Sequence, residues 1–177
     1  IKEALFKYDV RNFAIDSFQE LEKIIEATNY SKRINLHLRI KINNNSSLIK
    51  LTKKFGIEKK NTIKLLKSIR KYTSKIGICF HVGSQCMCPN TFEVAMNSSI
   101  KIFQESNVEM SFLNIGGGFP TVYPGLESLP LEDYFKVINR SFLKFKNSFS
   151  HLKLLAEPGR SLVSESMSLV VKVELRK

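Results

Sequence analysis

Three consecutive glycines, Gly116 to Gly118, follow the apolar run SFLNI and precede a phenylalanine and a proline. The chain has only 8 glycines, and a row of three costs backbone entropy on folding, so a packed strand would not favour them. Backbone without Cβ atoms lets N–H groups approach an anion closely. The segment therefore predicts either a flexible loop or a place where another group comes very close to the main chain.

A second segment suited to anions, AEPGRS, ends the next apolar run and contains Gly159 and Arg160. An arginine guanidinium can bind a phosphate through two parallel hydrogen bonds. In barrels of eight βα units, phosphate is often held by the loops that follow the last two strands. The two segments together predict a phosphate clamp made by Gly116, Gly117, Gly118, Gly159 and Arg160.

Two further side chains could act on a ring attached to that phosphate. His81 opens the segment HVGSQC, which also contains Ser84, and it could pack on a ligand ring or be an ordinary core residue. Glu157 could accept a hydrogen bond from a protonated ring nitrogen, or form a salt bridge with Arg39. Both alternatives stay open at the level of the sequence.

These residues lie at the ends of predicted strands. Apolar and polar residues alternate strictly over 34–42 (INLHLRIKI) and 76–82 (IGICFHV), and shorter apolar runs end at Asp16, at the glycines and at Glu157. The segments between these runs have apolar residues at helical spacing, and Ser17 and Glu20 have the spacing of a capping box. The predicted apolar faces are Phe18, Leu21, Ile24 and Ile25; Ile63, Leu66 and Ile69; Phe92, Met96, Ile100 and Phe103; and Phe135, Ile138, Phe142 and Phe145.

Alternating strands and helices predict an α/β fold with parallel strands and right-handed crossovers. A doubly wound sheet and a barrel both satisfy this order. The period of two places Asp16, Arg39, His81, Gly116 and Glu157 on one face at the carboxyl ends of their strands, where barrel active sites lie, and this favours the barrel. Five strands form only part of an eight-stranded barrel, which typically has about 250 residues.

The overall composition excludes several classes of protein. No apolar run is long enough for a membrane span, and the N-terminus has no signal-peptide pattern. Because the chain does not begin with Met, we expect a piece of a longer protein. The net charge of +12 could indicate a nucleic-acid-binding protein, but no arginine-rich run with interleaved aromatics occurs. The positive charge therefore favours a solvated surface that attracts anionic ligands.

The three cysteines are Cys79, Cys86 and Cys88. An odd number in a chain of this size predicts free thiols in a reducing cytoplasm rather than a disulfide framework. Cys86, Cys88 and His81 could suggest a metal site, but their spacing fits no common zinc pattern, so we expect no metal.

Six motifs occur in order: AIDS (14–17), LRI (38–40), KFGI (54–57), FHVGSQC (80–86), NIGGGFP (114–120) and AEPGRSLV (156–163). Together they resemble the ornithine decarboxylase family, pyridoxal-phosphate-dependent decarboxylases with an alanine-racemase-like barrel. HVGSQCM, YPGL and PLEDY are similar to the bacterial ornithine/lysine branch. The resemblance implies that residues 1–165 are the C-terminal part of the cofactor-binding (β/α)₈ TIM-type barrel, about five of its eight units. Residues 166–177 would be the first strand toward a C-terminal β-domain.

The resemblance also implies residue roles. Glu157 would pair with the pyridine nitrogen and His81 would stack on the ring. Asp16 and Arg39 would line the region of the ring and the catalytic lysine, and Lys54 would approach a homodimer interface. The phosphate would be held by Ser84, Gly116, Gly117, Gly118, Gly159 and Arg160.

The implied reaction is decarboxylation of a basic amino acid, with ornithine converted to putrescine for polyamine synthesis. The family's Schiff-base lysine lies in a motif like FYAVKCN, which this chain lacks, and its C-terminal domain is missing as well. We therefore expect the chain to be inactive by itself. A non-catalytic relic or decoy subunit and a basic nucleic-acid-binding protein are the alternatives. The decarboxylase hypothesis, which we favour, predicts a small amino-acid substrate and no nucleic-acid or membrane partner.

Overall fold

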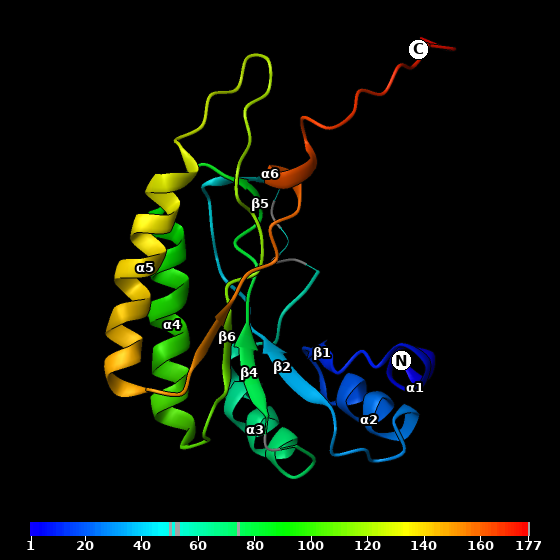
Figure 1. Cartoon of the computed structure of the whole chain (residues 1–177), viewed down its shortest axis with the longest axis vertical. Coiled ribbons are helices and arrows are strands. Elements are labelled where there is room, and N and C mark those ends of the chain that lie inside the picture. Colours follow the sequence, from blue (N-terminus) through cyan, green and yellow to red (C-terminus); the bar gives the residue numbers. More distant parts are fainter. Residues whose placement is uncertain (50, 52–53, 74, 177) are drawn as a thin grey trace.

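The computed structural model describes residues 1–49, 51, 54–73 and 75–176 (Figure 1). Five strands form a parallel sheet: β1 (Asn12–Ile15), β2 (Asn35–Arg39), β4 (Ile76–Cys79), β6 (Phe112–Asn114) and β7 (Lys153–Leu155). A separate antiparallel pair consists of β3 (Ser47–Ile49) and β5 (Ser84–Cys86). The helices are α1 (Lys2–Tyr8), α2 (Phe18–Ala27), α3 (Lys59–Arg70), α4 (Asn90–Ser106), α5 (Leu131–Ser148) and α6 (Arg160–Val163).

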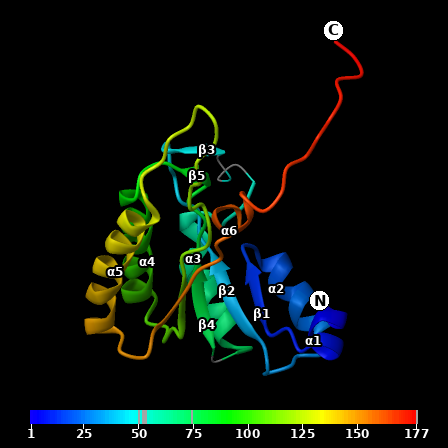
Figure 2. The ribbon, with the colours of Figure 1, turned by 45° about the horizontal axis from the view of Figure 1, so that its top comes forward.

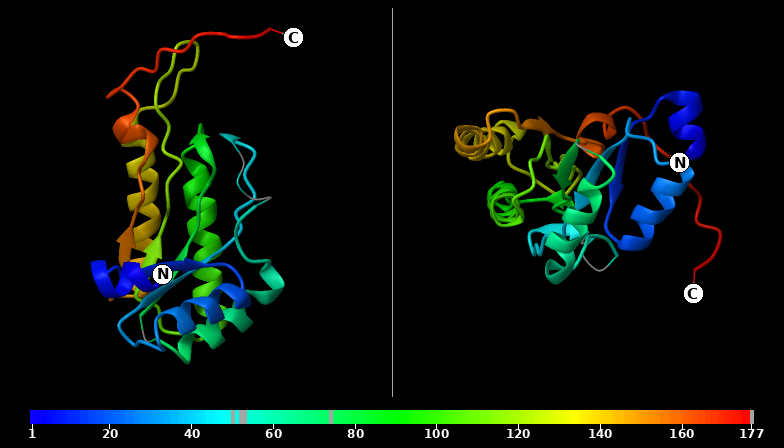
Figure 3. Two further views of the ribbon diagram at one scale, coloured as in Figure 1. Left: turned by 90° about the vertical axis from the view of Figure 1, so that its right-hand side faces the viewer. Right: turned by 90° about the horizontal axis from the view of Figure 1, so that it is seen from below.

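The order of the strands across the sheet distinguishes a barrel from a doubly wound fold. The sheet runs β1-β2-β4-β6-β7, which is chain order, so every crossover moves in the same direction. A doubly wound sheet instead reverses direction at a switch point and carries helices on both faces. Helices α2 to α5 follow one another around one side of the curved sheet (Figure 3). The predicted α/β fold with part of a barrel is therefore confirmed.

The core lies between the sheet and these helices. The predicted apolar face of β2 and its flanks is buried throughout, with Ile34, Leu36 and Leu38 fully inaccessible. The predicted helix cap is also confirmed, because the Oγ of Ser17 accepts a hydrogen bond of 3.2 Å from the N–H of Glu20. A dense apolar layer thus fixes the strand positions, and the opposite face of the sheet is free to carry polar residues.

One predicted helix face is wrong by one residue. Phe135 on α5 was expected in the core but is 47% exposed, whereas Tyr134 is fully buried. The hydroxyl of Tyr134 donates a hydrogen bond of 2.7 Å to the carbonyl oxygen of Cys86. A tyrosine can be buried when its hydroxyl has such a partner, so the polar side chain takes the core position.

The sheet is shorter than the alternating pattern predicts. β2 ends at Arg39 and β4 ends at Cys79, although the alternation continues to Ile42 and Val82. Beyond β2, Ile40 keeps a single bridge to Ile57. The residues after each strand therefore form loops at the carboxyl end of the sheet.

The C-terminal segment differs from the sequence prediction. Residues 160–163 form the short helix α6, and the described residues 167–176 form no strand and extend away from the body (Figure 1). The strand predicted there is not formed in this structure, and its assignment to a second domain stays a prediction. Among the described residues, no helix has the length and apolar character needed to cross a membrane.

Candidate functional site at the carboxyl ends of the strands

The carboxyl ends of the parallel strands point toward β3, β5 and α6 (Figure 2). Two neighbouring cavities lie at this part of the sheet. One, of about 400 Å³, is lined by Asp16, Arg39 and Lys54. The other, of about 340 Å³, is lined by residues that include Asn114 and Glu157. Asp16, Arg39 and Glu157, three of the five residues predicted for the polar face, therefore border these cavities.

The three glycines are explained by close packing against neighbouring backbone. Gly116 has a φ of +64°, and a Cβ on it would lie 2.0 Å from the carbonyl oxygen of Phe80. Gly118 has a φ of +107°, and a Cβ on it would lie 2.3 Å from the carbonyl oxygen of Gly83. Both distances exclude a side chain, and positive φ is costly for any other residue. The loop is thus packed tightly against the segment that follows β4, rather than being a loose turn.

The middle glycine lies between the two residues expected to contact the ring. A Cβ on Gly117 would lie 3.2 Å from Nε2 of His81 and 2.7 Å from the carbonyl oxygen of Glu157. The N–H of Glu157 donates a hydrogen bond of 2.8 Å to the carbonyl of Gly116. In the described part of the chain, the N–H groups of Gly117 and Gly118 form no hydrogen bond. His81, the glycine loop and the main chain of Glu157 therefore meet, with two backbone donors unused.

His81 has a defined protonation state in this arrangement. The N–H of Gly83 donates a hydrogen bond of 3.0 Å to Nδ1, so the ring proton is assigned to Nε2. Burial lowers the pKa of His81, the positive charge of Arg39 lowers it further, and Glu157 acts in the opposite direction. Near neutral pH the imidazole is uncharged, which suits stacking on an aromatic ring.

Glu157 is exposed and is held by one side chain. The Nδ2 of Asn114 donates a hydrogen bond of 2.6 Å to Oε1 of Glu157. The salt bridge with Arg39 that the sequence left open is not formed, and Glu157 has no ion pair among the described residues. The sequence reasoning gave Asn114 no role. The period of two could have revealed Asn114, because this residue precedes Gly116 by two positions and therefore lies on the same face of the strand.

Asp16 and Arg39 lie on the other side of the sheet end, next to a loop. Oδ2 of Asp16 accepts a hydrogen bond of 2.8 Å from the N–H of Gly56. The guanidinium of Arg39 lies 4.6 Å from the ring centre of Phe55. The loop carrying Phe55 and Gly56 therefore packs onto the ends of β1 and β2. Lys54 is exposed beside it, and its role at an interface stays a prediction.

Arg160 reaches the site less directly than the sequence predicts. Its Nη1 donates a hydrogen bond of 3.0 Å to the hydroxyl of Tyr123, and its guanidinium lies 5.7 Å from that ring. Thr121 and Ser164 join α6 to the same loop through hydroxyls 2.8 Å apart. Arg160 is thus fixed beside the loop that follows the glycines, with Tyr123 as its immediate partner.

Two other predicted phosphate ligands make few contacts. Gly159 is exposed, and a Cβ on it would meet nothing within 4 Å. Ser84 on β5 is half-buried, and its hydroxyl forms no hydrogen bond with the described residues. Their roles stay predictions.

Cys79 and His37 lie on the same face, beneath these residues. Burial raises the pKa of the Cys79 thiol to about 12, so it is a neutral thiol and a poor nucleophile. His37 is buried, and its Nε2 lies 3.2 Å from Oδ1 of Asn12. Its Nδ1 has no hydrogen-bond partner in the described structure. The sequence reasoning singled out neither residue for the site, and burial is the property that a single sequence does not reveal.

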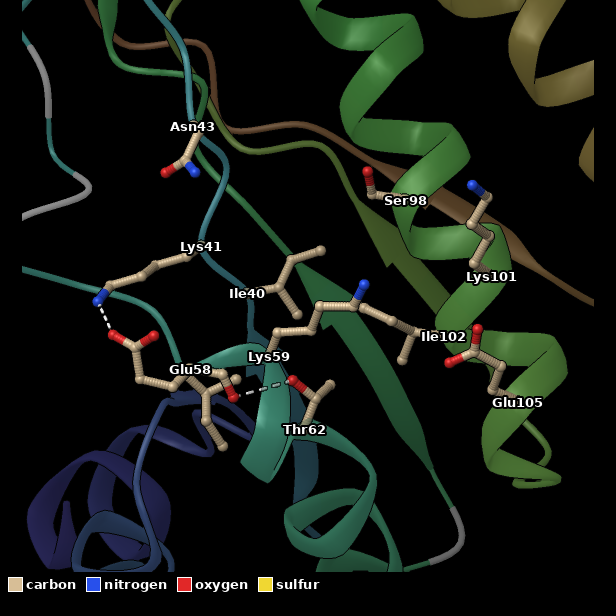
Figure 4. A pocket seen from close by; sticks show the side chains of 11 residues that line it. Ile40, Lys41, Asn43, Glu58, Lys59, Thr62, Ser98, Lys101, Ile102 and Glu105 are labelled. Atoms are coloured by element: carbon tan, nitrogen blue, oxygen red, sulfur yellow. Dashed lines mark hydrogen bonds and ion pairs between the residues drawn. The ribbon is translucent and has the colours of Figure 1, made fainter.

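A cavity larger than these two lies elsewhere, between α3 and α4 (Figure 4). It has a volume of about 640 Å³ and is lined by Lys59, Lys101 and Glu105, with Lys41 paired to Glu58 at its edge. None of the residues predicted for the site lines it. We place the candidate site at the strand ends, because convergent polar groups and unused backbone donors define a binding site better than volume does.

Residues 1–164 match the family described as pyridoxal-dependent decarboxylase, pyridoxal binding domain. The chain belongs to this family. The resemblance inferred from the six motifs is confirmed, and so is pyridoxal phosphate as the cofactor associated with the family.

Relatives match almost the whole chain. Ornithine decarboxylase from Mus musculus is 34% identical over 95% of this chain and 36% of its own length. Lysine/ornithine decarboxylase from Selenomonas ruminantium is 30% identical over 97% of this chain and 43% of its own length. Antizyme inhibitor 2 from Xenopus laevis is 30% identical over 97% of this chain and 37% of its own length. The chain thus spans roughly two fifths of the length of these relatives.

Solved structures share the fold. The lysine decarboxylase from Selenomonas ruminantium superposes with a TM-score of 0.78 at 30% identity, covering 91% of this chain and 42% of that one. SrLDC in complex with PLP and cadaverine superposes with a TM-score of 0.76 at 28% identity, covering 91% of this chain and 40% of that one.

Proposed function

We propose that this chain forms the cofactor-binding part of a pyridoxal-phosphate-dependent decarboxylase whose substrate is a basic amino acid, ornithine in the first place. The observation that carries the proposal is the convergence of His81, the glycine loop and Glu157 at the strand ends of a domain from this family. These are the residues that the family resemblance implies for the ring and the phosphate.

The residues present fit pyridoxal phosphate. The N–H groups of Gly117 and Gly118 and the hydroxyl of Ser84, which have no hydrogen-bond partner among the described residues, are neutral donors suited to a phosphate. Arg160 adds a positive charge beside the same loop. The missing Cβ of Gly117 lets the main chain pass within contact distance of Nε2 of His81 and of the carbonyl oxygen of Glu157. We infer that the ring would lie against His81 and that the phosphate would lie at the glycine loop.

The residues would then divide the work as follows. Glu157 would accept a hydrogen bond from the ring nitrogen and so keep that nitrogen protonated. The uncharged imidazole of His81 would cover one face of the ring and exclude water from it. Pyridoxal phosphate, when bound, supplies an electron sink for the electron pair left as the α-carboxylate departs as CO₂. Asp16 and Arg39 would border the entrance to the ring from β1 and β2.

Ornithine is proposed because decarboxylases of ornithine and of lysine/ornithine are among the relatives of this chain, with putrescine as the expected product. The test is release of labelled CO₂ from carboxyl-labelled ornithine and lysine. We expect the complete protein to prefer ornithine, and the 177-residue chain alone to be inactive because it contains no FYAVKCN-like motif. CO₂ release by this chain at the rate of an intact decarboxylase would contradict the expected inactivity.

A non-catalytic subunit is the second candidate, because a relative of equal coverage is named antizyme inhibitor 2 and not as a decarboxylase. The flanking coding sequence separates the two. An in-frame FYAVKCN-like segment upstream would support the enzyme, and a stop codon there would support the relic. For the complete enzyme we also propose a cytoplasmic homodimer with Lys54 near the interface, which sedimentation of wild-type and Lys54→Ala protein would test.

A further inference from the structure

A single amide joins the two halves of the candidate site. Asn114 ends β6 and is 7% exposed. Its Nδ2 donates a hydrogen bond of 2.6 Å to Oε1 of Glu157, and its Oδ1 accepts one of 2.9 Å from the N–H of Gly116. Its backbone carbonyl accepts a third, of 3.1 Å, from the N–H of Phe80 on the segment leading to His81. Asn114 therefore contacts the acid, the glycine loop and the end of β4.

The primary amide of Asn114 can make both side-chain bonds because it carries a donor and an acceptor. A carboxylate only accepts hydrogen bonds, and a backbone N–H only donates. The partner between them must donate at one end and accept at the other. An aspartate here would keep the bond to Gly116 but would place a second carboxylate against Glu157, where like charges repel.

Glu157 depends on this bond for its orientation. Its side chain is exposed, and Asn114 provides the only hydrogen bond to its carboxylate among the described residues. A free glutamate side chain samples several rotamers and loses that freedom when it is held. The bond fixes Oε1 and leaves Oε2 available to another donor.

We propose that Asn114 is a positioning residue that sets the Glu157 carboxylate for the ring nitrogen of the cofactor and couples that orientation to the glycine loop at the phosphate end. This inference rests on the proposed function. One side chain then fixes both Glu157, at the ring end of the site, and Gly116, at the phosphate end. A displacement of either residue would therefore shift the other.

The test compares two ligands that differ only at the ring nitrogen. Pyridoxamine 5′-phosphate is the first probe, because its amine cannot condense with the many lysines of this chain. The second is its analogue with C–H in place of the ring nitrogen. We expect the unaltered chain to bind the first more tightly by about tenfold or more, the size of a charge-assisted hydrogen bond. Calorimetry or fluorescence titration measures the ratio.

Asn114→Ala and the isosteric Asn114→Asp should both reduce that ratio to about one. Gln85→Ala is the matched control. The buried amide of Gln85 also makes two bonds, to the carbonyl oxygen (2.7 Å) and the N–H (3.0 Å) of Thr121, but among the described residues it forms no hydrogen bond with Glu157. It should keep the preference for the ring nitrogen even if the fold is destabilised. In a Glu157→Gln background, Asn114→Ala should have no further effect on the ratio.

The outcomes separate this inference from the proposed function. Failure of the unaltered chain to bind either ligand would overturn both. Binding with a clear preference for the ring nitrogen that Asn114→Ala and Asn114→Asp retain would overturn only the role of Asn114. Loss of the preference in Gln85→Ala to the same degree would also overturn it, because the effect would then be general loosening of the fold.

Discussion

The two faces of the five-stranded sheet are built from the same strands and differ in how completely their groups are paired. On the helix-facing side, Leu36, Leu38 and Leu113 are inaccessible to solvent. On the other side, Nδ1 of His37 has no hydrogen-bond partner among the described residues, and Glu157 is exposed and held there by one amide. An apolar face is stabilised by contact with any closely packed apolar neighbour, whereas each buried polar group needs a hydrogen-bond partner in a specific position.

Within one sheet, the helix-facing side therefore contributes mainly to stability and the opposite side mainly to binding. The side chains on the helix-facing side pack against the helices and need no ligand, and this packing fixes where each strand ends. On the other side, some donors and acceptors form no hydrogen bond within the described part of the chain, among them the N–H groups of Gly117 and Gly118. A ligand supplies the partners that such a face lacks.

Neighbouring residues of β2 give the largest contrast between the faces. Leu38→Ala should lower the free energy of unfolding by about 2–5 kcal/mol, because it leaves a cavity in a fully buried layer. Arg39→Ala removes only a half-buried stacking contact with Phe55 and should cost about 1 kcal/mol or less. Urea denaturation followed by circular dichroism measures both. Equal losses would show that the two faces contribute alike.

Two glycines of the site test how tightly the loops pack. Gly116→Ala should destabilise the fold by about 1–3 kcal/mol, because the new methyl group would overlap the carbonyl of Phe80 and φ is positive. Gly159→Ala meets open space at a negative φ and should change stability by about 0.5 kcal/mol or less. A harmless Gly116→Ala would mean that the loop is flexible after all.

The polar face should also make stability depend on pH. Burial lowers the pKa values of His37 and His81 in the folded chain, while in the unfolded chain they titrate near about 6.5. The folded state therefore binds fewer protons, so their contribution is fully present above about pH 6.5 and is lost as the pH falls through the folded values. His37→Gln should weaken this dependence. An unchanged pH profile in His37→Gln would exclude His37 as a source.

The sequence predicted the parallel order, the buried face of β2 and the helix cap at Ser17, because periodicity and capping are local signals. It also placed Asp16, Arg39, His81 and Glu157 at one end of the sheet. It did not find that Phe80 and Gly83 are the close neighbours of the glycines, nor that Asn114 bonds Glu157. It expected Phe135 rather than Tyr134 in the core. These features depend on distances between loops far apart in sequence, which no local pattern encodes.

The central claim is that the strand ends, not the cavity between α3 and α4, bind the cofactor. Titration of the ¹⁵N-labelled chain with pyridoxamine 5′-phosphate, followed by amide NMR, tests it most directly. We predict saturable shifts concentrated at Gly117, Gly118 and Ser84, with Lys59 and Lys101 unaffected. Shifts centred on Lys59 and Lys101, or spread evenly over the surface lysines with the glycine loop unmoved, would contradict the account.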